Sequence, residues 1–357
     1  MGLGHITDVP GVLVGHHQRR GRGWRTGTTV LRVEGGSMAS CDVRGGGPGT
    51  RETDLLDPIA MIDRVHAICL SGGSAFGLAA AHGVMRWHEE RHAGFPVGPD
   101  PSHVVPIVPA AVIFDLGRGG AFSNRPDETF GYRACAAARH GAVATGAVGA
   151  GTGAVAGGLQ GGVGTASMTL ANGIVVGALA VVNAAGQVID PATALPRFHE
   201  QLRLRRPPAT ERQALIEATR TPPTPLNTTI GVVATSAALT KAECRKMAEV
   251  AHDGLARAVR PVHSMFDGDI IFCLSTAHHV IDAGSAPGLR RLDTRPGVVN
   301  TLLAAAADCF ALACTRAVVE ARSIGGAPSY IDLCPSAFLG IPSASKQTPR
   351  SKEATAS

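Results

Sequence analysis

The chain of 357 residues has few aromatic side chains and even fewer lysines. Aromatic residues make up 4% of it and hydrophobic residues 45%, so its core must be built mainly from Ala, Val, Leu and Ile. The first 227 residues contain no lysine, because Lys241 is the first of the four in the chain. A reaction that needs a lysine from that part of the chain is therefore excluded.

Targeting and membrane segments are also missing from the sequence. The N-terminus has neither the charged and apolar regions of a secretory signal nor the Ser or Thr that a myristoylation signal has at position 6. The stretch 140–189 carries no Asp, Glu, Lys or Arg, but glycines interrupt it. Its longest apolar run, 174–182, is far shorter than the ~20 residues that span a bilayer. We expect a cytoplasmic protein without a membrane partner.

Signals for nucleic acid, metal and redox chemistry are weak. The net charge is +5, but no block of Lys and Arg accompanies it, so a nucleic-acid partner is not expected. The eight cysteines form no CxxC pair and are expected to be small buried residues in a reducing compartment. His278 and His279 are adjacent and would point to opposite faces of a strand, which does not favour a metal site. The sequence therefore predicts a reaction without a metal ion or another cofactor.

Buried-type strands alternate with Ala-rich helices along most of the chain. Strands are expected at 27–33, 38–43, 65–70, 174–183, 228–235 and 270–276. Helices are expected at 75–92, 132–140, 241–259 and 298–321, the third behind a capping box of Thr240 and Glu243. This order favours an α/β fold in which a sandwich of sheets is flanked by helices. Residues 1–340 would form one domain, and the Ser-, Lys- and Thr-rich tail 341–357 would be disordered.

Two turns resemble known functional loops without matching them. The glycine-rich loop 44–54 lacks the GxxxxGK[ST] pattern of a phosphate loop, so we expect it near an active site or a subunit interface. Ser74 follows a strand and precedes a helix, as a nucleophile on an elbow does, but the pattern GxSxG is not met. We therefore interpret Ser74 as the N-cap of the helix that follows.

The junction of Asn227 and Thr228 is the most unusual point of the sequence. The segment 221–225 contains three prolines and cannot form a regular helix or a central strand. Small and β-branched residues with strand character follow it, and a hydroxyl is an unusual group at the start of a buried strand. We hypothesise that the chain cuts itself between Asn227 and Thr228, which makes Thr228 an N-terminal nucleophile.

Three further side chains could complete such a site. Asp267 and Asp269 precede a strand, and their i, i+2 spacing places both on one side of it, where they could orient the Thr228 hydroxyl and its new amine. Asn183 ends the most apolar strand and could donate an N–H to a developing oxyanion. Each also has an ordinary interpretation, because a DxD pair is more often a solvated turn and Asn183 can be a turn residue.

Five stretches spread along nearly the whole chain form a specific set. They are ITDVPGVLVGH at 6–16, GGVGTAS at 161–167, VN at 182–183, NTTIGV at 227–232 and DGD at 267–269. This set resembles the self-processing L-aminopeptidase/D-Ala-esterase/amidase family, which includes the β-peptidyl aminopeptidases and the nylon-oligomer hydrolases. The Asn-Thr junction and the two Asp make the chain most similar to the nylon-oligomer hydrolase branch, whereas other branches use Ser as the nucleophile.

The resemblance implies a fold, a processing event and a set of catalytic residues. The fold would be a four-layer α/β/β/α sandwich, shared with the ornithine acetyltransferases. Autocleavage would give a long chain (1–227) and a short chain (228–340) that stay together and form a ring-like tetramer of heterodimers. The substrate would be a small peptide or amide. The implied roles are Thr228 as nucleophile, Asp267 and Asp269 as its orienting acids, and Asn183 in the oxyanion hole.

The chain departs from this family at two positions. Members often have a Tyr where this chain has Phe114, which cannot donate a hydrogen bond, and some carry a Lys where Gln160 stands. These departures bear on processing rate and amidase activity rather than on the fold. Phe114 and Phe76 are also candidate substrate-binding residues, with core packing as the alternative. Two other functions stay open: an acyltransferase of the ornithine acetyltransferase type, and a non-catalytic assembly protein that retains the fold.

Overall fold

The computed structural model describes residues 3–220, 227–281 and 294–338, so the tail predicted to be disordered lies outside the described residues. A nine-stranded mixed sheet forms its centre, in the order β10-β11-β14-β15-β2-β4-β7-β3, with β1 paired to β2. Its strands are β1 (Val12–Gly21), β2 (Trp24–Val43), β3 (Thr50–Arg51), β4 (Arg64–Ser71), β7 (Ala110–Val112), β10 (Gly162–Thr169), β11 (Val175–Asn183), β14 (Thr228–Ala237) and β15 (Ile270–His279). Three small pairs join β5 (Phe95–Pro96) to β6 (Val104–Val105), β8 (Val155–Ala156) to β9 (Leu159–Gln160), and β12 (Ile189–Asp190) to β13 (Leu195–Pro196).

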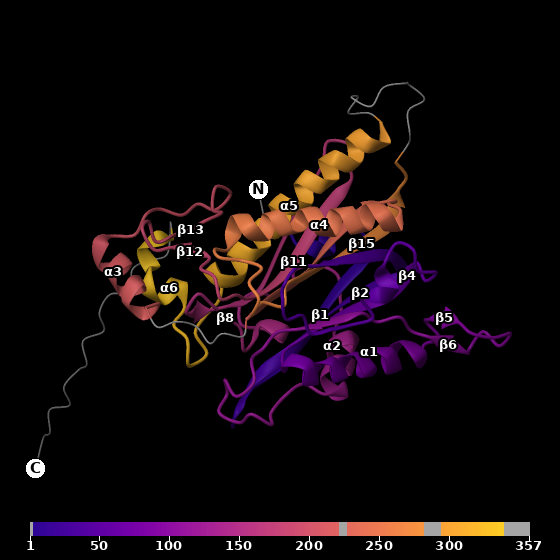
Figure 1. Ribbon diagram of the computed structural model, residues 1–357, viewed down its shortest axis with the longest axis horizontal. Coiled ribbons are helices and arrows are strands. Elements are labelled where there is room, and N and C mark those ends of the chain that lie inside the picture. Colours follow the sequence, from indigo (N-terminus) through magenta and orange to yellow (C-terminus); the bar gives the residue numbers. More distant parts are fainter. Residues whose placement is uncertain (1–2, 221–226, 282–293, 339–357) are drawn as a thin grey trace, which may run out of the picture.

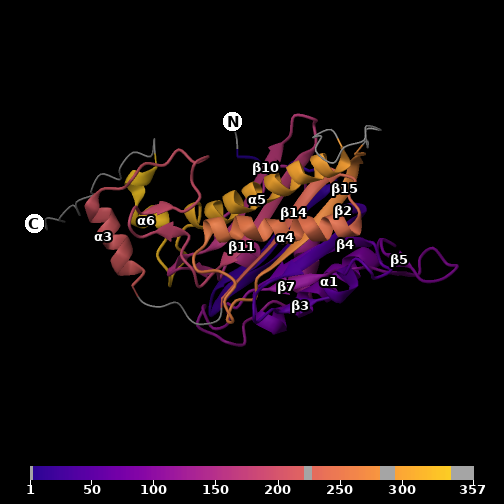
Figure 2. The ribbon, with the colours of Figure 1, turned by 45° about the horizontal axis from the view of Figure 1, so that its top comes forward.

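Helices cover this sheet from both sides. The α-helices are α1 (Ala80–Glu89), α2 (Glu128–Ala136), α3 (Ala209–Ala218), α4 (Lys241–Ala258), α5 (Arg295–Val319) and α6 (Tyr330–Leu333). Figure 1 shows α4 and α5 together on one side of the strands and α1 and α2 on the other. In Figure 2, α4 and α5 lie along the strands β11, β14 and β15. The helices predicted at 241–259 and 298–321 are thus confirmed, with ends shifted by a few residues.

The strand β2 joins two sheet layers. Its first part pairs with β1 and β4, and residues 38–43 pair with β15. Between them Gly35 and Gly36 have φ angles of 70° and 75°, and the register with β4 shifts there. Only glycine adopts such angles without strain, so the strand bends at this point. The two strands predicted at 27–33 and 38–43 are therefore parts of one continuous but bent strand, and the prediction that they are separate was wrong.

Three hydrophobic clusters separate four layers of structure. The first lies between α4 and α5 and the strands β10, β11, β14 and β15. The second fills the space between the two sheet layers, where side chains of β1, β2 and β4 meet those of β11, β14 and β15. The third lies between α1 and α2 and the outer face of β2, β4 and β7. The predicted four-layer α/β/β/α sandwich is confirmed.

The central strands are apolar on both faces because each face meets a different cluster. Along β14, Ile230 and Val232 face the inter-sheet cluster, and Val233 faces the helix layer. The helix α5 has the length and composition of a membrane span, but 89% of its most apolar window is buried inside the molecule. Small residues on both helices allow α4 and α5 to come close. A Cβ on Gly254 of α4 would collide with the carbonyl oxygen of Ala307 of α5.

One of the two predicted helix caps is confirmed, and the other was wrong. Thr240 and Glu243 form the predicted capping box, in which the Glu243 N–H donates to Thr240 Oγ1 at 3.2 Å and the Thr240 N–H to Glu243 Oε2 at 2.8 Å. Ser74 is not an N-cap, because it has φ 50° and opens a 3-10 helix, Ser74–Ala79, that precedes α1. The N–H of Gly73 is instead bound by the carboxylate of Asp115, at 2.7 Å.

Candidate active site

Thr228 and Asn183 meet where two central strands end. Thr228 is the first residue of β14, Asn183 is the last of β11, and the antiparallel register pairs them directly. Because side chains alternate along a strand, Thr228 shares the inter-sheet side with Ile230, and Asn183 shares it with Val181. Both side chains are buried, with 6% and 0% of their surface exposed. We call this side of the sheet edge the nucleophile face, after the role proposed for Thr228 below.

The Asn227–Thr228 peptide bond is held between the Thr228 hydroxyl and a backbone donor. Thr228 Oγ1 donates a hydrogen bond to the carbonyl oxygen of Asn227 at 2.5 Å. The N–H of Gly268 donates to the same oxygen at 3.2 Å and so polarises this carbonyl. A Cβ on Gly268 would lie 3.0 Å from Thr228 Oγ1 and 2.8 Å from the carbonyl oxygen of Gly47. The close approach therefore favours glycine at position 268.

The two acids lie on the opposite side of the same sheet edge, which we call the acid face. Asp269 Oδ1 accepts a hydrogen bond from the backbone N–H of Thr229 at 2.7 Å. Asp267 Oδ2 accepts from the N–H and the Oγ of Ser264, at 2.8 and 2.6 Å. Within the described residues neither carboxylate bonds to the Thr228 hydroxyl. The acids thus hold the backbone around the nucleophile rather than its side chain.

A histidine that the sequence did not single out fixes Asp269. The backbone N–H of His263 and its ring Nδ1 both contact Asp269 Oδ2, at 3.2 and 2.8 Å. His263 has φ 58°, a conformation that non-glycine residues adopt at a cost, often at functional sites. Its ring lies edge-on to that of His252, 4.8 Å away. Burial raises the pKa of Asp267, and the neighbouring charge of Asp269 raises it further, against the hydrogen bonds from Ser264.

The glycine-rich loop after β2 packs over this segment. The N–H groups of Arg44 and Gly45 donate to the carbonyl oxygen of Asp269, at 2.9 and 3.2 Å. The N–H of Gly47 donates to the carbonyl oxygen of Asp267, at 2.8 Å. The loop predicted to lie near an active site or a subunit interface thus lies beside the candidate site.

Asn183 is fixed in one orientation by its neighbours. Its Oδ1 accepts hydrogen bonds from Arg118 Nη1 and from the N–H of Val155, the latter at 3.0 Å. Two donors at one atom identify it as the oxygen, so the amide nitrogen faces the carbonyl oxygen of Phe114, to which it donates at 3.3 Å. An amide carries two N–H groups, and this bond uses one of them.

Two arginines supply the positive charge that lysine does not. Arg118 Nη1 also donates to the carbonyl oxygen of Gly153 at 2.7 Å, and burial lowers the pKa of Arg118 to about 10, so it stays charged at neutral pH. Arg25 Nη2 donates to Gln160 Oε1 at 2.7 Å, and Gln160 is fully buried. The position where the family resemblance led us to expect Lys in some members therefore receives a cation from another strand. Sequence reasoning missed both arginines because no motif spacing relates them to Asn183 or Gln160.

The two phenylalanines proposed for substrate binding differ in their surroundings. Phe114 is half-buried and contributes its carbonyl oxygen to the Asn183 network. Phe76 is 51% exposed, with the guanidinium of Arg125 3.7 Å from the centre of its ring. The alternative that Phe76 is a core residue was wrong, because the 3-10 helix that replaces the first turn of α1 leaves it at the surface.

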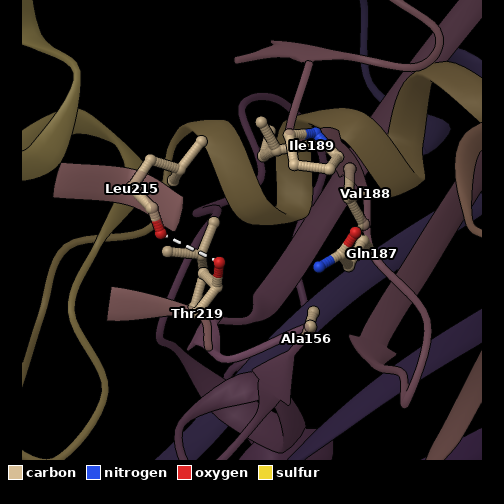
Figure 3. A pocket seen from close by; sticks show the side chains of 9 residues that line it. Ala156, Gln187, Val188, Ile189, Leu215 and Thr219 are labelled. Carbon is tan, nitrogen blue, oxygen red and sulfur yellow. Dashed lines mark hydrogen bonds between the residues drawn. The ribbon is translucent and has the colours of Figure 1, made fainter. Parts of the chain in front are cut away.

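Other candidate sites are less suited to chemistry. The cavity in Figure 3, between α3 and the strand β12, has a volume of about 10 Å³, room for about one water molecule. No group of three or more His, Cys, Asp or Glu among the described residues is arranged to hold a metal ion. The expectation of a metal-independent reaction stays a prediction. All eight cysteines are free and buried, as predicted.

The fold matches those of solved aminopeptidases. A β-aminopeptidase of Burkholderia sp. aligns with a TM-score of 0.67 and 25% identity, over 93% of this chain and 92% of that one. The L-aminopeptidase D-Ala-esterase/amidase of Ochrobactrum anthropi, described as a variant of the Ntn-hydrolase fold, aligns with a TM-score of 0.66 and 21% identity, over 91% of this chain and 88% of that one. The architecture is therefore that of the Ntn-hydrolase aminopeptidases.

The sequence comparisons define the family. A model of peptidase family S58 matches residues 4–330, and the chain belongs to this family. An uncharacterized aminopeptidase of Mycobacterium tuberculosis is 50% identical over 349 residues, which is 94% of this chain and 99% of the relative. A 6-aminohexanoate-oligomer endohydrolase of Kocuria sp. is 31% identical over 297 residues, or 80% and 78% of the two chains. The family resemblance of the motifs is confirmed, and the protein is an aminopeptidase-type hydrolase.

Proposed function

We propose that this protein cleaves its own Asn227–Thr228 bond and then uses Thr228 as an N-terminal nucleophile on small amides or peptides. One observation carries the proposal. The Thr228 hydroxyl and the Gly268 N–H meet at the carbonyl oxygen of Asn227, so a nucleophile and an oxyanion donor are present at the same peptide bond. Burial of both residues of the junction, at 1% and 6% exposure, keeps bulk water away from this bond.

The cleavage proceeds by an N-to-O acyl shift. Thr228 Oγ1 attacks the carbonyl carbon of Asn227, and the hydroxyl proton passes to the Thr228 nitrogen as the C–N bond breaks. The product is an ester between the Asn227 acyl group and Thr228 Oγ1. Water then hydrolyses this ester, which gives a carboxyl group on Asn227 and restores the Thr228 hydroxyl beside a free amine.

The mature site repeats this chemistry on a substrate. The new α-amine, with an ordinary pKa of ~7.7–8.0, takes the proton from the Thr228 hydroxyl, which attacks the substrate carbonyl and forms an acyl-enzyme. Asn183 offers its second amide N–H to the oxyanion, and Asp269 holds the strand at Thr229. The proton of the base goes to the leaving amine, and water releases the acyl group.

The names of the relatives support the proposed substrate class. Similar proteins bear the names aminopeptidase and 6-aminohexanoate-oligomer endohydrolase, so we propose a small peptide-like amide for this chain as well. An acyltransferase would use the same acyl-enzyme and pass its acyl group to an amine instead of water. Product analysis with and without an added amine acceptor separates these two outcomes. Assembly of the cleaved chains into a tetramer of heterodimers, in the cytoplasm, is part of the proposal.

Intact mass spectrometry of the purified protein tests self-cleavage directly. We expect two fragments that meet at Asn227 and Thr228, and a single full-length species for Thr228→Val. Thr229→Val is the matched control, because the Thr229 hydroxyl has no hydrogen-bond partner among the described residues and the substitution keeps its shape and backbone N–H. A wild-type chain that stays uncut after long incubation, or a Thr228→Val chain that is cut, contradicts the proposal.

A further inference from the structure

A cavity beside the nucleophile face collects arginine side chains. Its volume is about 240 Å³, and five glycines together with Trp24 and Ile324 form much of its wall. Its four charged lining residues are Arg20, Arg22, Arg25 and Arg118. Within the described residues this lining contains no carboxylate. Guanidinium groups gathered around one space repel one another unless an anion lies between them.

Arg25 is the least exposed of the four arginine residues. It is 8% exposed, and its Nε is buried without a hydrogen-bond partner among the described residues. A Cβ on Gly326 would collide with Arg25 Nη1, so glycine at this position leaves the space that the guanidinium occupies. A buried cation with an unsatisfied N–H is costly until a ligand completes its hydrogen bonds.

One carboxylate offsets part of this charge from outside the cavity. Asp115 interacts electrostatically with both Arg25 and Arg118, and its Oδ1 accepts a hydrogen bond from the N–H of Gly73. It does not belong to the lining. A single carboxylate against four guanidinium groups leaves the cavity positively charged.

Arg118 connects the cavity to the nucleophile. Its Nη1 donates to Asn183 Oδ1, and Asn183 is the cross-strand partner of Thr228. Paired residues of antiparallel strands lie about 5 Å apart. An anion held by Arg118 would therefore sit a short chain length from Thr228.

We infer that this cavity binds a carboxylate of the substrate, so that the enzyme acts on small amides that carry a free carboxylate near the scissile bond. The inference rests on the proposed function. The planar guanidinium fork binds a carboxylate through two parallel hydrogen bonds. A volume of about 240 Å³ leaves room for a carboxylate on a short chain.

Trp24 provides a binding signal that does not depend on turnover. The chain has two tryptophans, so Trp87→Phe leaves Trp24 as the single reporter, and Thr228→Ala in the same chain blocks catalysis. The probes are 6-acetamidohexanoate and its primary amide, which differ only in the carboxylate, and each is titrated by fluorescence. We expect the acid to bind at least about tenfold more tightly than the amide, and Arg25→Gln to remove most of this preference.

A second substitution keeps the test decisive if Arg25→Gln does not fold. Arg22 is exposed, and Arg22→Gln should weaken binding of the acid while leaving that of the amide unchanged. Equal affinity for the acid and the amide overturns the inference. So does an affinity for the acid that neither substitution changes, and so does tighter binding of inorganic phosphate than of the acid.

Turnover by the wild-type enzyme separates this inference from the proposed function. The substrates are the linear dimer of 6-aminohexanoate and its primary amide, and a higher kcat/KM for the acid supports both ideas. Equal kcat/KM for the two means that the cavity inference fails while the hydrolase stands. Binding of the acid that depends on Arg25, without cleavage of either dimer, means that the hydrolase proposal fails for these substrates while the cavity keeps its ligand.

Discussion

The nucleophile face and the acid face of one sheet edge hold groups of opposite charge. On the nucleophile face, Thr228 and Asn183 lie beside the guanidinium of Arg118. On the acid face, Asp267 and Asp269 are bound by Ser264 and His263. A single strand, β14, contributes its side chain to the first face and its backbone N–H at Thr229 to the second. The proposed nucleophile and the groups that hold its strand in place are therefore separated by the sheet itself.

This separation assigns different tasks to the two faces. The nucleophile face has the donors and cations that stabilise negative charge, which is what an acyl-transfer intermediate needs. The acid face has carboxylates whose hydrogen bonds go to the backbone, which suits the positioning of a strand end. Substitutions on the nucleophile face should therefore change the chemical step most, and those on the acid face should act through geometry.

The largest effect is expected at Asn183. Asn183→Asp keeps an oxygen for Arg118 and Val155 but removes the N–H donor, so kcat should fall on the order of 10²- to 10³-fold, about 2.7–4 kcal/mol. Steady-state kinetics of the cleaved enzyme measures this loss. Asn183→Ala should lose a similar factor in rate and additional stability, because it removes one of the acceptors of the half-buried Arg118 guanidinium. If Asn183→Asp keeps more than half of the wild-type rate, Asn183 has no part in the oxyanion hole.

The buried carboxylate behind the nucleophile face gives a pH-dependent effect of nearly this size. Burial raises the pKa of Asp115 to about 6, against the hydrogen bond from the Gly73 N–H and the charge of Arg118. The folded protein therefore binds more protons than the unfolded one between about pH 4 and 6. The stability from this group is present below about pH 4 and is lost as pH rises through 6, by at most about 3 kcal/mol.

Urea unfolding at several pH values tests this prediction. The difference in unfolding free energy between the wild type and Asp115→Asn should change by up to about 3 kcal/mol from pH 4 to 6.5 and then stay constant. The wild type should lose stability relative to the variant as pH rises. A difference that is flat across this range means that Asp115 is ionised at its ordinary pKa in the folded protein.

A methyl group at Gly268 should disturb the junction between the two faces. Gly268→Ala forces the loop at Gly47 or the Thr228 hydroxyl to move, because the new Cβ would lie 2.8 and 3.0 Å from them. We expect self-cleavage to slow on the order of 10²-fold, since small displacements of reacting atoms have such effects. The rate is followed by mass spectrometry after synthesis. Gly98→Ala is the control, because nothing lies within 4 Å of its Cβ, and it should cleave like the wild type.

The smallest effect is expected on the acid face. Asp269→Asn replaces one acceptor by an amide, which cannot accept from both Thr229 and His263, and should slow turnover about tenfold, or 1.4 kcal/mol. His263→Gln should slow turnover by a similar factor, and adding Asp269→Asn to it should not slow turnover further.

A double-mutant cycle of Asp269→Asn with Asn183→Asp should show coupling below about 0.5 kcal/mol, because the two faces act separately. Strong coupling would refute this division of tasks.

The sequence was sufficient for the layered α/β fold and for the strand that begins at Thr228, since both depend on local patterns. The β-branched run after Thr228, the capping box at Thr240 and the apolar helix predicted at 298–321 are each read from neighbouring residues. The structure places Asn183 directly opposite Thr228, as a common site requires. The side of the sheet on which each acid lies could not be predicted. It depends on the register that pairs Asp267 with Asn227, which are far apart in the sequence. Arg118 and His263 likewise reach the site through loops that have no periodicity.

The strand order has a consequence for when self-cleavage can occur. The strands β14 and β15 lie between β11 and β2, both of which belong to the first 227 residues. Without residues 228–279, the strands β11 and β2 would lie three strand spacings apart, roughly 14 Å, with no strand between them. The Gly268 donor also comes from the later segment. If the proposed self-cleavage uses this donor, we expect the chain to stay uncut until residues 228–279 have joined the sheet.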